Sequence, residues 1–149
     1  MKKTIKLETG KLFTDITNII SGYATEWGKS GIVSVFSPHT TLAIWLTENE
    51  ILHHADIRFF LDSNVPMTKE PEGSHKNVKY LHDMISLRND VPEDERINGH
   101  SHIRYLFFNS SETIPIDHGR LFLGEWKKVF AVELDPIRPR EIICTFVGG

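Results

Sequence analysis

The spacing of apolar residues predicts three helices. From residue 16 to 27 apolar side chains recur every three or four positions, Thr14 or Asp15 is available as the N-cap, and Gly28 follows where a helix ends. A second helix is predicted over residues 49–63, and a third begins at Asn98, although residues 105–108 also fit a strand. The expected core-facing residues are Ile16, Ile19, Ile20, Tyr23, Ala24 and Trp27, then Leu52, Ala55 and Phe59, then Ile103, Leu106 and Phe107.

Alternating or continuously apolar runs predict strands between and after these helices. The strands are expected at residues 4–8, 31–36, 41–47, 113–116, 120–124, 129–134 and 141–147, with loops at 63–73, 89–96 and 135–140. Short turns between strands are typical of antiparallel pairing. We therefore expect one α+β domain over residues 1–149, with antiparallel sheets packed like a sandwich and helices on one side.

Composition narrows the class of protein. The chain has a net charge of −3, 40% hydrophobic and 25% charged residues, so its charge gives no argument for nucleic-acid binding. No apolar stretch is long enough for a membrane span or follows the basic N-terminus as a secretion signal, and we expect a cytoplasmic protein. The single cysteine, Cys144, lies in an apolar strand and is expected to be buried.

Three of the eight histidines are the better candidates for chemistry: His39 at a strand end, His82 in a loop and His102 on the third helix. Helix positions two apart point about 200° from one another, so His100 and His102 do not easily face one centre if the segment is helical from Asn98 onward. Either His100 lies in the turn before the helix or only one of the two is a ligand. We expect His102 near the packed face and His100 outward. The remaining histidines are expected to face solvent or to lie in loops and turns: His53, His54, His75 and His118.

Three imidazoles from separate segments match the ligand composition of catalytic zinc sites, which keep one position open for water or substrate. The sequence therefore predicts a divalent metal, zinc before magnesium, at His39, His82 and His102.

Acidic and basic residues supply the other candidate groups. Glu133, Glu48 and Asp56 are candidate catalytic carboxylates. Together with Asp83 and Asp135 they are also candidates for orienting imidazoles or binding magnesium. Glu133 shares a strand face with two apolar residues, so it is either buried with a partner or on a solvated face. Arg138 and Arg140 are spaced to grip a phosphate or carboxylate, and Thr40 and Thr41 offer hydroxyl and N–H donors; the alternative is a pair of surface arginines in a loop.

These motifs together resemble the YjbQ family, also called UPF0047, over about residues 32–147. The resemblance rests on the ordered motifs around His39, Glu48, Asp56, His82 and His102, followed by a Gly-x-Leu-x-Leu-Gly-x-Trp core. That core is formed by Gly119, Leu121, Leu123, Gly124 and Trp126, and the motifs around Glu133 and Arg140 complete the match.

The resemblance implies a YjbQ-like α+β fold, a homotrimer and a site near the subunit boundary around His39, His82 and His102. It also implies secondary thiamine-phosphate synthase activity, in which a hydroxymethylpyrimidine diphosphate joins a thiazole phosphate and pyrophosphate is released. Two alternatives remain open, a metal-dependent hydrolase of a small phosphorylated compound and a non-enzymatic trimer that binds a metal or a small ligand. Neither nucleic acid nor a membrane is expected as a partner.

Overall fold

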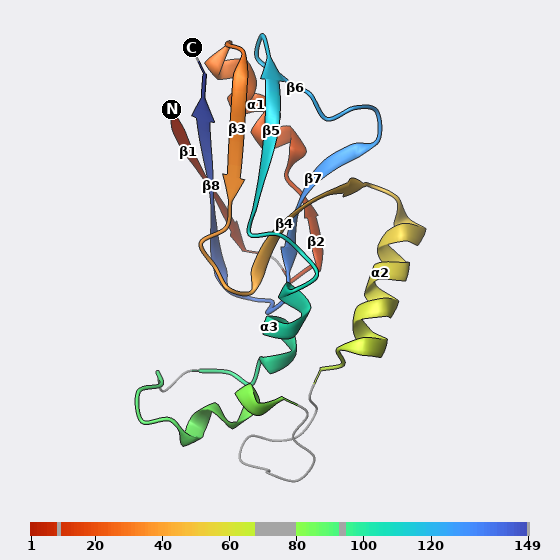
Figure 1. Cartoon of the computed structure of the whole chain (residues 1–149), viewed down its shortest axis with the longest axis vertical. Coiled ribbons are helices and arrows are strands. Elements are labelled where there is room, and N and C mark those ends of the chain that lie inside the picture. Colours follow the sequence, from red (N-terminus) through yellow and green to blue (C-terminus); the bar gives the residue numbers. More distant parts are fainter. Residues whose placement is uncertain (9, 68–79, 93–94, 149) are drawn as a thin grey trace.

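Two antiparallel sheets form the body of the molecule in the computed structural model, which describes residues 1–8, 10–67, 80–92 and 95–148 (Figure 1). Every strand pairing in them is antiparallel. The five-stranded sheet has the order β1 (Lys2–Glu8), β8 (Pro139–Val147), β3 (Gly31–Phe36), β5 (Ser111–Asp117) and β6 (Arg120–Leu121). The three-stranded sheet has the order β2 (Phe13–Asp15), β7 (Lys127–Glu133) and β4 (Leu42–Glu48). The predicted α+β class with antiparallel sheets is confirmed.

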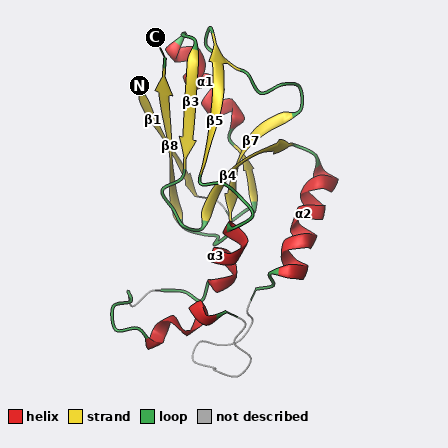
Figure 2. Ribbon diagram, viewed as in Figure 1, coloured by secondary structure: helices red, strands yellow, loops and turns green. Residues whose placement is uncertain are grey.

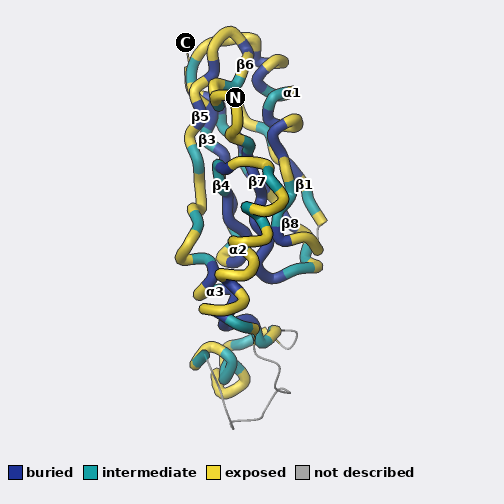
Figure 3. Tube along the Cα trace, turned by 90° about the vertical axis from the view of Figure 1, so that its right-hand side faces the viewer, coloured by how far each residue is buried: buried dark blue, intermediate teal, exposed yellow. Residues whose placement is uncertain are grey.

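The main core lies between the facing sides of the two sheets. Alternate residues of the five-stranded sheet, such as Val33 and Ile142, meet residues of the other sheet such as Ile44 and Val129, and all four are fully buried. Cys144 belongs to this core, as expected, and its burial raises the pKa of its thiol to about 11. Figure 3 shows these buried stretches running through the strands.

Helix α1 (Thr17–Trp27) closes one end of this core beside β6 and β7 (Figure 2). Asp15 Oδ1 accepts the N–H of Thr17, and Gly28 ends the helix in the left-handed conformation at φ 64°. Ile20 is buried while its neighbour Ile19 is 39% exposed, so the predicted helix is confirmed except at that position.

Helix α2 (Ile51–Asn64) presents a different face from the predicted one. Leu52 is 70% and Phe59 74% exposed, Ala55 is exposed as well, and Leu61 is the buried residue of the helix. Leu61 packs on the second face of the three-stranded sheet together with Phe130 and residues around it. Helices α1 and α2 thus both lie on the side of the five-stranded sheet that faces the three-stranded sheet.

The face of α2 that meets the sheet carries the two histidines that were expected in solvent. His53 Nε2 lies 2.9 Å from Thr47 Oγ1, and His54 Nε2 lies 3.0 Å from the carbonyl oxygen of Glu48. The end of β4 offers these polar partners, and they orient the helix where the apolar stripe does not.

Two further helices follow, η1 (Leu81–Leu87), a 3-10 helix that the sequence did not predict, and α3 (Gly99–Tyr105). The predicted core residues of α3 are exposed, by 41% at Ile103, 76% at Leu106 and 51% at Phe107. Its buried side chains are polar instead. Ser101 Oγ donates to the carbonyl of Leu134, and Arg104 Nε donates to that of Val65, because loop carbonyls at this end need donors.

Other boundaries differ in smaller ways. Of the strand expected at 120–124, the pairing covers Arg120–Leu121, and β2 was not predicted. His75 and most of the loop at 63–73 lie outside the described residues. No helix in the described ranges has the length and apolar character needed to cross a membrane.

Candidate functional site

Four segments that are far apart in the sequence enclose one cavity of about 370 Å³. They are the β3–β4 loop, η1, α3 with the residues before it, and the β7–β8 loop with the start of strand β8. The cavity, here called the histidine pocket, brings together seven of the ten predicted site residues: His39, Thr40, Thr41, His82, His102, Arg138 and Arg140. Its other lining residues are Pro38, Ile85, Glu95, Asn98 and Asp135.

His82 and His102 lie side by side on one wall of this pocket, with ring centroids 4.5 Å apart. Asp83 Oδ1 accepts the N–H of Gly99 at 2.8 Å, which fixes η1 against the start of α3 and so sets this distance. Burial, and then the neighbouring His82, lowers the pKa of His102. The His102 imidazole is therefore favoured in its neutral form, which can accept a proton.

His100 is buried rather than outward, with 4% exposure, which corrects the predicted orientation. The two histidines do avoid one centre, as the helix geometry requires. Because Ser101 Oγ donates to Leu134, its oxygen accepts from His100 Nε2 at 3.2 Å, and His100 Nδ1 is a buried nitrogen with no hydrogen-bond partner in the described chain. Burial, and then Arg104, lowers the pKa of His100.

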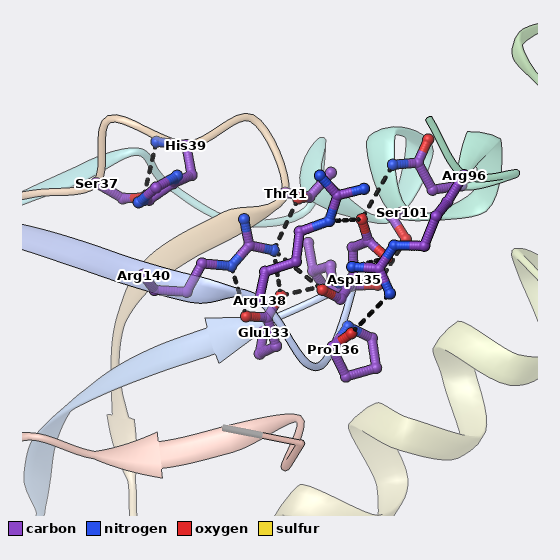
Figure 4. A network of polar contacts seen from close by, with 12 residues as sticks. Ser37, His39, Thr41, Arg96, Ser101, Glu133, Asp135, Pro136, Arg138 and Arg140 are labelled. Carbon is purple, nitrogen blue, oxygen red and sulfur yellow. Dashed lines mark hydrogen bonds and ion pairs between the residues drawn. The ribbon is translucent and has the colours of Figure 1, made fainter. Parts of the chain in front are cut away.

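His39 is held from the opposite side of the pocket. Its Nε2 accepts the backbone N–H of Glu141 at 3.0 Å. The backbone N–H of His39 donates to Ser37 Oγ at 3.3 Å (Figure 4). A neutral imidazole that accepts at Nε2 carries its proton on Nδ1. Burial, followed by Arg140, lowers the pKa of His39. In this arrangement neither ring nitrogen of His39 has a lone pair free for a metal.

The three histidines therefore do not form a common ligand set in this arrangement. Within the described ranges no group of three or more His, Cys, Asp or Glu side chains is placed to hold a metal ion. His82 and His102 are adjacent and supply two imidazoles, whereas a zinc site takes at least three protein ligands. The residues present fit a metal only in part.

Glu133 is buried with a partner, the first of the two alternatives. Arg140 Nε donates to Glu133 Oε2 at 2.7 Å and Arg140 Nη2 to Oε1 at 2.6 Å, a two-pronged pair with side chains 4% and 0% exposed. Glu133 Oε1 also accepts the N–H of Asp135, and Arg140 Nη2 reaches Thr41 Oγ1 at 3.0 Å. Glu133 lies behind Arg140 and orients it, and it does not line the histidine pocket.

Asp135 organises the other side of the pocket. Its Oδ2 accepts from Asn98 Nδ2 at 3.1 Å and lies 3.0 Å from Arg138 Nε, without the alignment of a hydrogen bond. Arg138 Nη2 lies 3.7 Å from Glu95. Arg138 is 34% exposed, so its guanidinium is held at the carboxylate while part of it remains accessible from the pocket.

The other two predicted carboxylates are not brought to this pocket. Glu48 is exposed at the end of β4, and Asp56 is exposed on α2. Thr41 is buried and its hydroxyl oxygen accepts from Arg140, while Thr40 is exposed at the rim. His118 is exposed in its turn, as expected.

The sequence reasoning did not select Glu95 or Asn98 as site residues, and it named Asp135 only as one of several carboxylates for orienting imidazoles or binding magnesium. In the structure Asn98 is 4% exposed and Asp135 6%. The signal for them in the sequence is a polar residue at a predicted helix start, Asn98, and one directly after a predicted strand, Asp135. Their mutual contact joins residues 37 positions apart. No local pattern contains such a contact.

Fold and site together define an α+β protein with two antiparallel sheets and a polar pocket lined by histidines and arginines. The family model described as UPF0047 protein YjbQ-like matches residues 2–149. The chain belongs to this family.

Individual relatives agree with that assignment. A UPF0047 protein of Methanothermobacter thermautotrophicus is 33% identical over 90% of this chain and 81% of its own length. A hypothetical protein of Aeropyrum pernix K1, known from a crystal structure, has the same fold with a TM-score of 0.79, at 24% identity over 100% of this chain and 99% of its own. A crystal structure of an uncharacterised YjbQ/UPF0047 protein of Clostridium acetobutylicum gives a TM-score of 0.73 at 27% identity and covers 99% of both chains.

Replacing Glu133 by Gln tests the buried ion pair. E133Q leaves the Arg140 charge without its counter-charge in a buried position, and we expect a loss of about 3–5 kcal/mol in the free energy of unfolding. The measurement is urea denaturation. The matched control is E48Q at an exposed carboxylate, expected within about 0.5 kcal/mol of wild type. Equal effects of the two variants would show that the pair does not hold this end of the fold.

Stability is expected to fall in mild acid because buried histidines resist protonation. The pKa of His100 lies below its ordinary 6.5 in the folded state, so between these two values the unfolded chain binds more protons and the free energy of unfolding falls as pH is lowered; above 6.5 the contribution is constant. Urea denaturation at about pH 7.5 and about pH 5.5 measures this slope. H100Q is expected to reduce it, while the exposed-turn control H118N leaves it unchanged; a slope that is the same in both variants refutes the role of His100.

Proposed function

We propose that the histidine pocket binds a small phosphorylated compound and that the chain is an enzyme acting on it. The observation that supports this most is the convergence of Arg138, Arg140 and three histidines from separate segments on one cavity of about 370 Å³. Arginine guanidinium groups recognise phosphate oxygens through paired N–H donors. The surrounding imidazoles add groups that exchange protons near neutral pH.

The reaction that family resemblance suggests is that of a thiamine-phosphate synthase. The thiazole nitrogen forms a bond to the methylene carbon of the pyrimidine, the carbon–oxygen bond to the diphosphate breaks, and its electron pair leaves with pyrophosphate. Such a step needs positive charge where negative charge accumulates on the leaving oxygen. Arg138 and Arg140 are the cations in the pocket that supply it, and Glu133 keeps Arg140 in position.

A second candidate reaction is hydrolysis of a small phosphorylated compound. It is favoured by the close pair His82 and His102, because a neutral His102 beside a second imidazole can take a proton from an attacking water. The third candidate is a trimer that binds a metal or a small ligand in the same pocket and catalyses no reaction.

We propose that a divalent metal, zinc rather than magnesium, would take only His82 and His102 as ligands among the three predicted histidines. Bound there, it would neutralise phosphate charge. Its remaining ligands would come from outside the set of residues described in the structure, because those residues hold no group of three or more suited to a metal. The proposed reaction therefore assigns no step to a metal.

Assays of product release separate the three candidates. With both the pyrimidine diphosphate and the thiazole phosphate present, a synthase releases pyrophosphate, whereas a hydrolase releases phosphate or pyrophosphate from one compound alone. We expect H102Q to lower turnover by about 100-fold or more, and H118N, at an exposed turn, to leave it unchanged. Elemental analysis of the same preparations reports any metal and its loss in H102Q. Ligand binding without turnover across a panel of phosphorylated compounds would exclude both enzymes and favour the third candidate, the non-enzymatic binding protein.

We also propose that the chain assembles as a homotrimer. Apolar side chains on the outer face of α2 are widely exposed, with Ile51 at 80%, Leu52 at 70% and Phe59 at 74%. Several large apolar side chains exposed on one helix are typical of an interface. A closed ring needs a second, different surface, and the loop with Phe122, 73% exposed, and Trp126, 66% exposed, offers one.

Sedimentation measures the assembly directly. At micromolar concentration wild type is expected at three times the chain mass of 17.1 kDa. F59E places a charge on the α2 face and is expected to give the single-chain mass, while F36E, on the outer face of the five-stranded sheet, keeps the trimer. A wild-type species of 17.1 kDa contradicts the assembly.

A further inference from the structure

A second depression lies beside the histidine pocket and shares a wall with it. It has a volume of about 540 Å³, and its lining residues are His39, Arg96, Ile137, Arg138, Pro139 and Arg140. Three of them, His39, Arg138 and Arg140, also line the histidine pocket. Within the described part of the chain, this lining contains three arginines and no carboxylate. The depression is therefore an arginine-lined extension of the first pocket, and the carboxylates that pair with these arginines lie behind its lining.

One carboxylate holds two of these arginines side by side. Arg138 Nε lies 3.0 Å from Asp135 Oδ2, and Arg96 Nη2 lies 3.8 Å from Asp135 Oδ1. Arg96 Nη1 also donates to the carbonyl of Pro136 at 3.2 Å (Figure 4). Two guanidinium groups repel one another, and the shared Asp135 offsets that repulsion. Glu95 Oε1, 3.7 Å from Arg138 Nη2, supplies a second counter-charge at the edge of the pair. Arg96 is 42% exposed and Arg138 34%, so both remain accessible.

Arg140 completes the arginine wall from the strand side. Its hydrogen bonds within the described residues run through Nε and Nη2, to Glu133, Thr41 and Asp135. A guanidinium has five N–H donors, two of them on Nη1. Arg140 is thus fixed by one edge and keeps Nη1 for a further acceptor.

The loop that carries these groups has a fixed and unfavourable backbone conformation. Ile137 has φ 67°, the left-handed region that β-branched residues rarely adopt, and its side chain is 74% exposed. Pro136 precedes it, and Pro139 restricts the chain two residues later. Burial of the Ile137 side chain does not compensate this strain, which is typical of loops shaped for a ligand.

We propose that this depression is a second anion subsite, in which Arg96 and Arg138 bind one phosphate of a diphosphate whose other phosphate contacts Arg140 in the histidine pocket. The inference rests on the proposed function and narrows its substrate to compounds that carry a diphosphate. Arg138 and Arg140 line both cavities, so a ligand that spans them meets guanidinium groups along its whole length. Arg96 lines only the second cavity and is the residue that tells a diphosphate from a monophosphate.

Calorimetric titration with inorganic pyrophosphate and with inorganic phosphate tests the subsite. We expect wild type to bind pyrophosphate about 10-fold or more tightly than phosphate. R96Q is expected to lose this preference by weakening pyrophosphate about 10-fold, with phosphate affinity changed less than about twofold, and R96K to restore part of it as a point charge. The control is R88Q, whose guanidinium is paired with Asp90 on an exposed segment outside both cavities.

The outcomes separate the subsite from the proposed function. If phosphate binds and shifts the His102 imidazole signals in NMR, but pyrophosphate binds no more tightly, the subsite is refuted and phosphate binding in the histidine pocket stands. An R96Q variant that keeps the full preference, or that weakens both anions equally, also refutes the subsite. If wild type binds neither anion, the proposed function fails together with it.

Discussion

The ion pair between Glu133 and Arg140 is the interaction on which the architecture of the site depends. Glu133 ends β7 in the three-stranded sheet and Arg140 lies at the start of β8 in the five-stranded sheet, so the pair joins the two sheets where the chain crosses between them. Two charges removed from water are tolerated only when their remaining hydrogen-bonding groups are satisfied. Thr41 and the backbone of Asp135 meet that need, and this fixes the β3–β4 loop and the β7–β8 loop at the same place.

The chemistry of the pocket follows from this crossing. The two loops place His39 and Arg138 on one wall, and the opposite wall comes from η1 and α3 through His82 and His102. On the first wall carboxylates set the directions of the arginines. On the second, burial favours a neutral His102. The charge recognition and the proton exchange that we propose would therefore fall to different parts of the fold.

The sequence predicted the elements better than the faces that they bury. The strand at Gly31–Phe36 follows directly from its apolar run, and α1 from the recurrence of Ile16, Ile20 and Ala24. In α2 and α3 the apolar stripes were misleading, because carbonyl groups of Glu48 and Leu134 bind His54 and Ser101 and so turn the polar faces inward. Spacing alone contains no information on such partners.

The site was predictable as a set of residues but not as a geometry. Position in the chain and family motifs selected His39, His82 and His102, and the pocket contains all three. The geometry depends on contacts distant in sequence: His39 Nε2 accepts the N–H of Glu141, which lies 102 residues further along the chain. The two readings of Glu133 were equally compatible with its strand, and only the approach of Arg140 from the other sheet decides between them.

The contrast between the two walls has an evolutionary consequence. None of the residues of η1 is buried, whereas the opposite wall is continuous with the sandwich core. Substitutions at Ile85 and its neighbours in η1 can therefore reshape the pocket with little effect on the stability of the sheets. The η1 side of the pocket is thus free to vary in sequence, while the wall formed by the two loops is constrained by the same packing that joins the sheets.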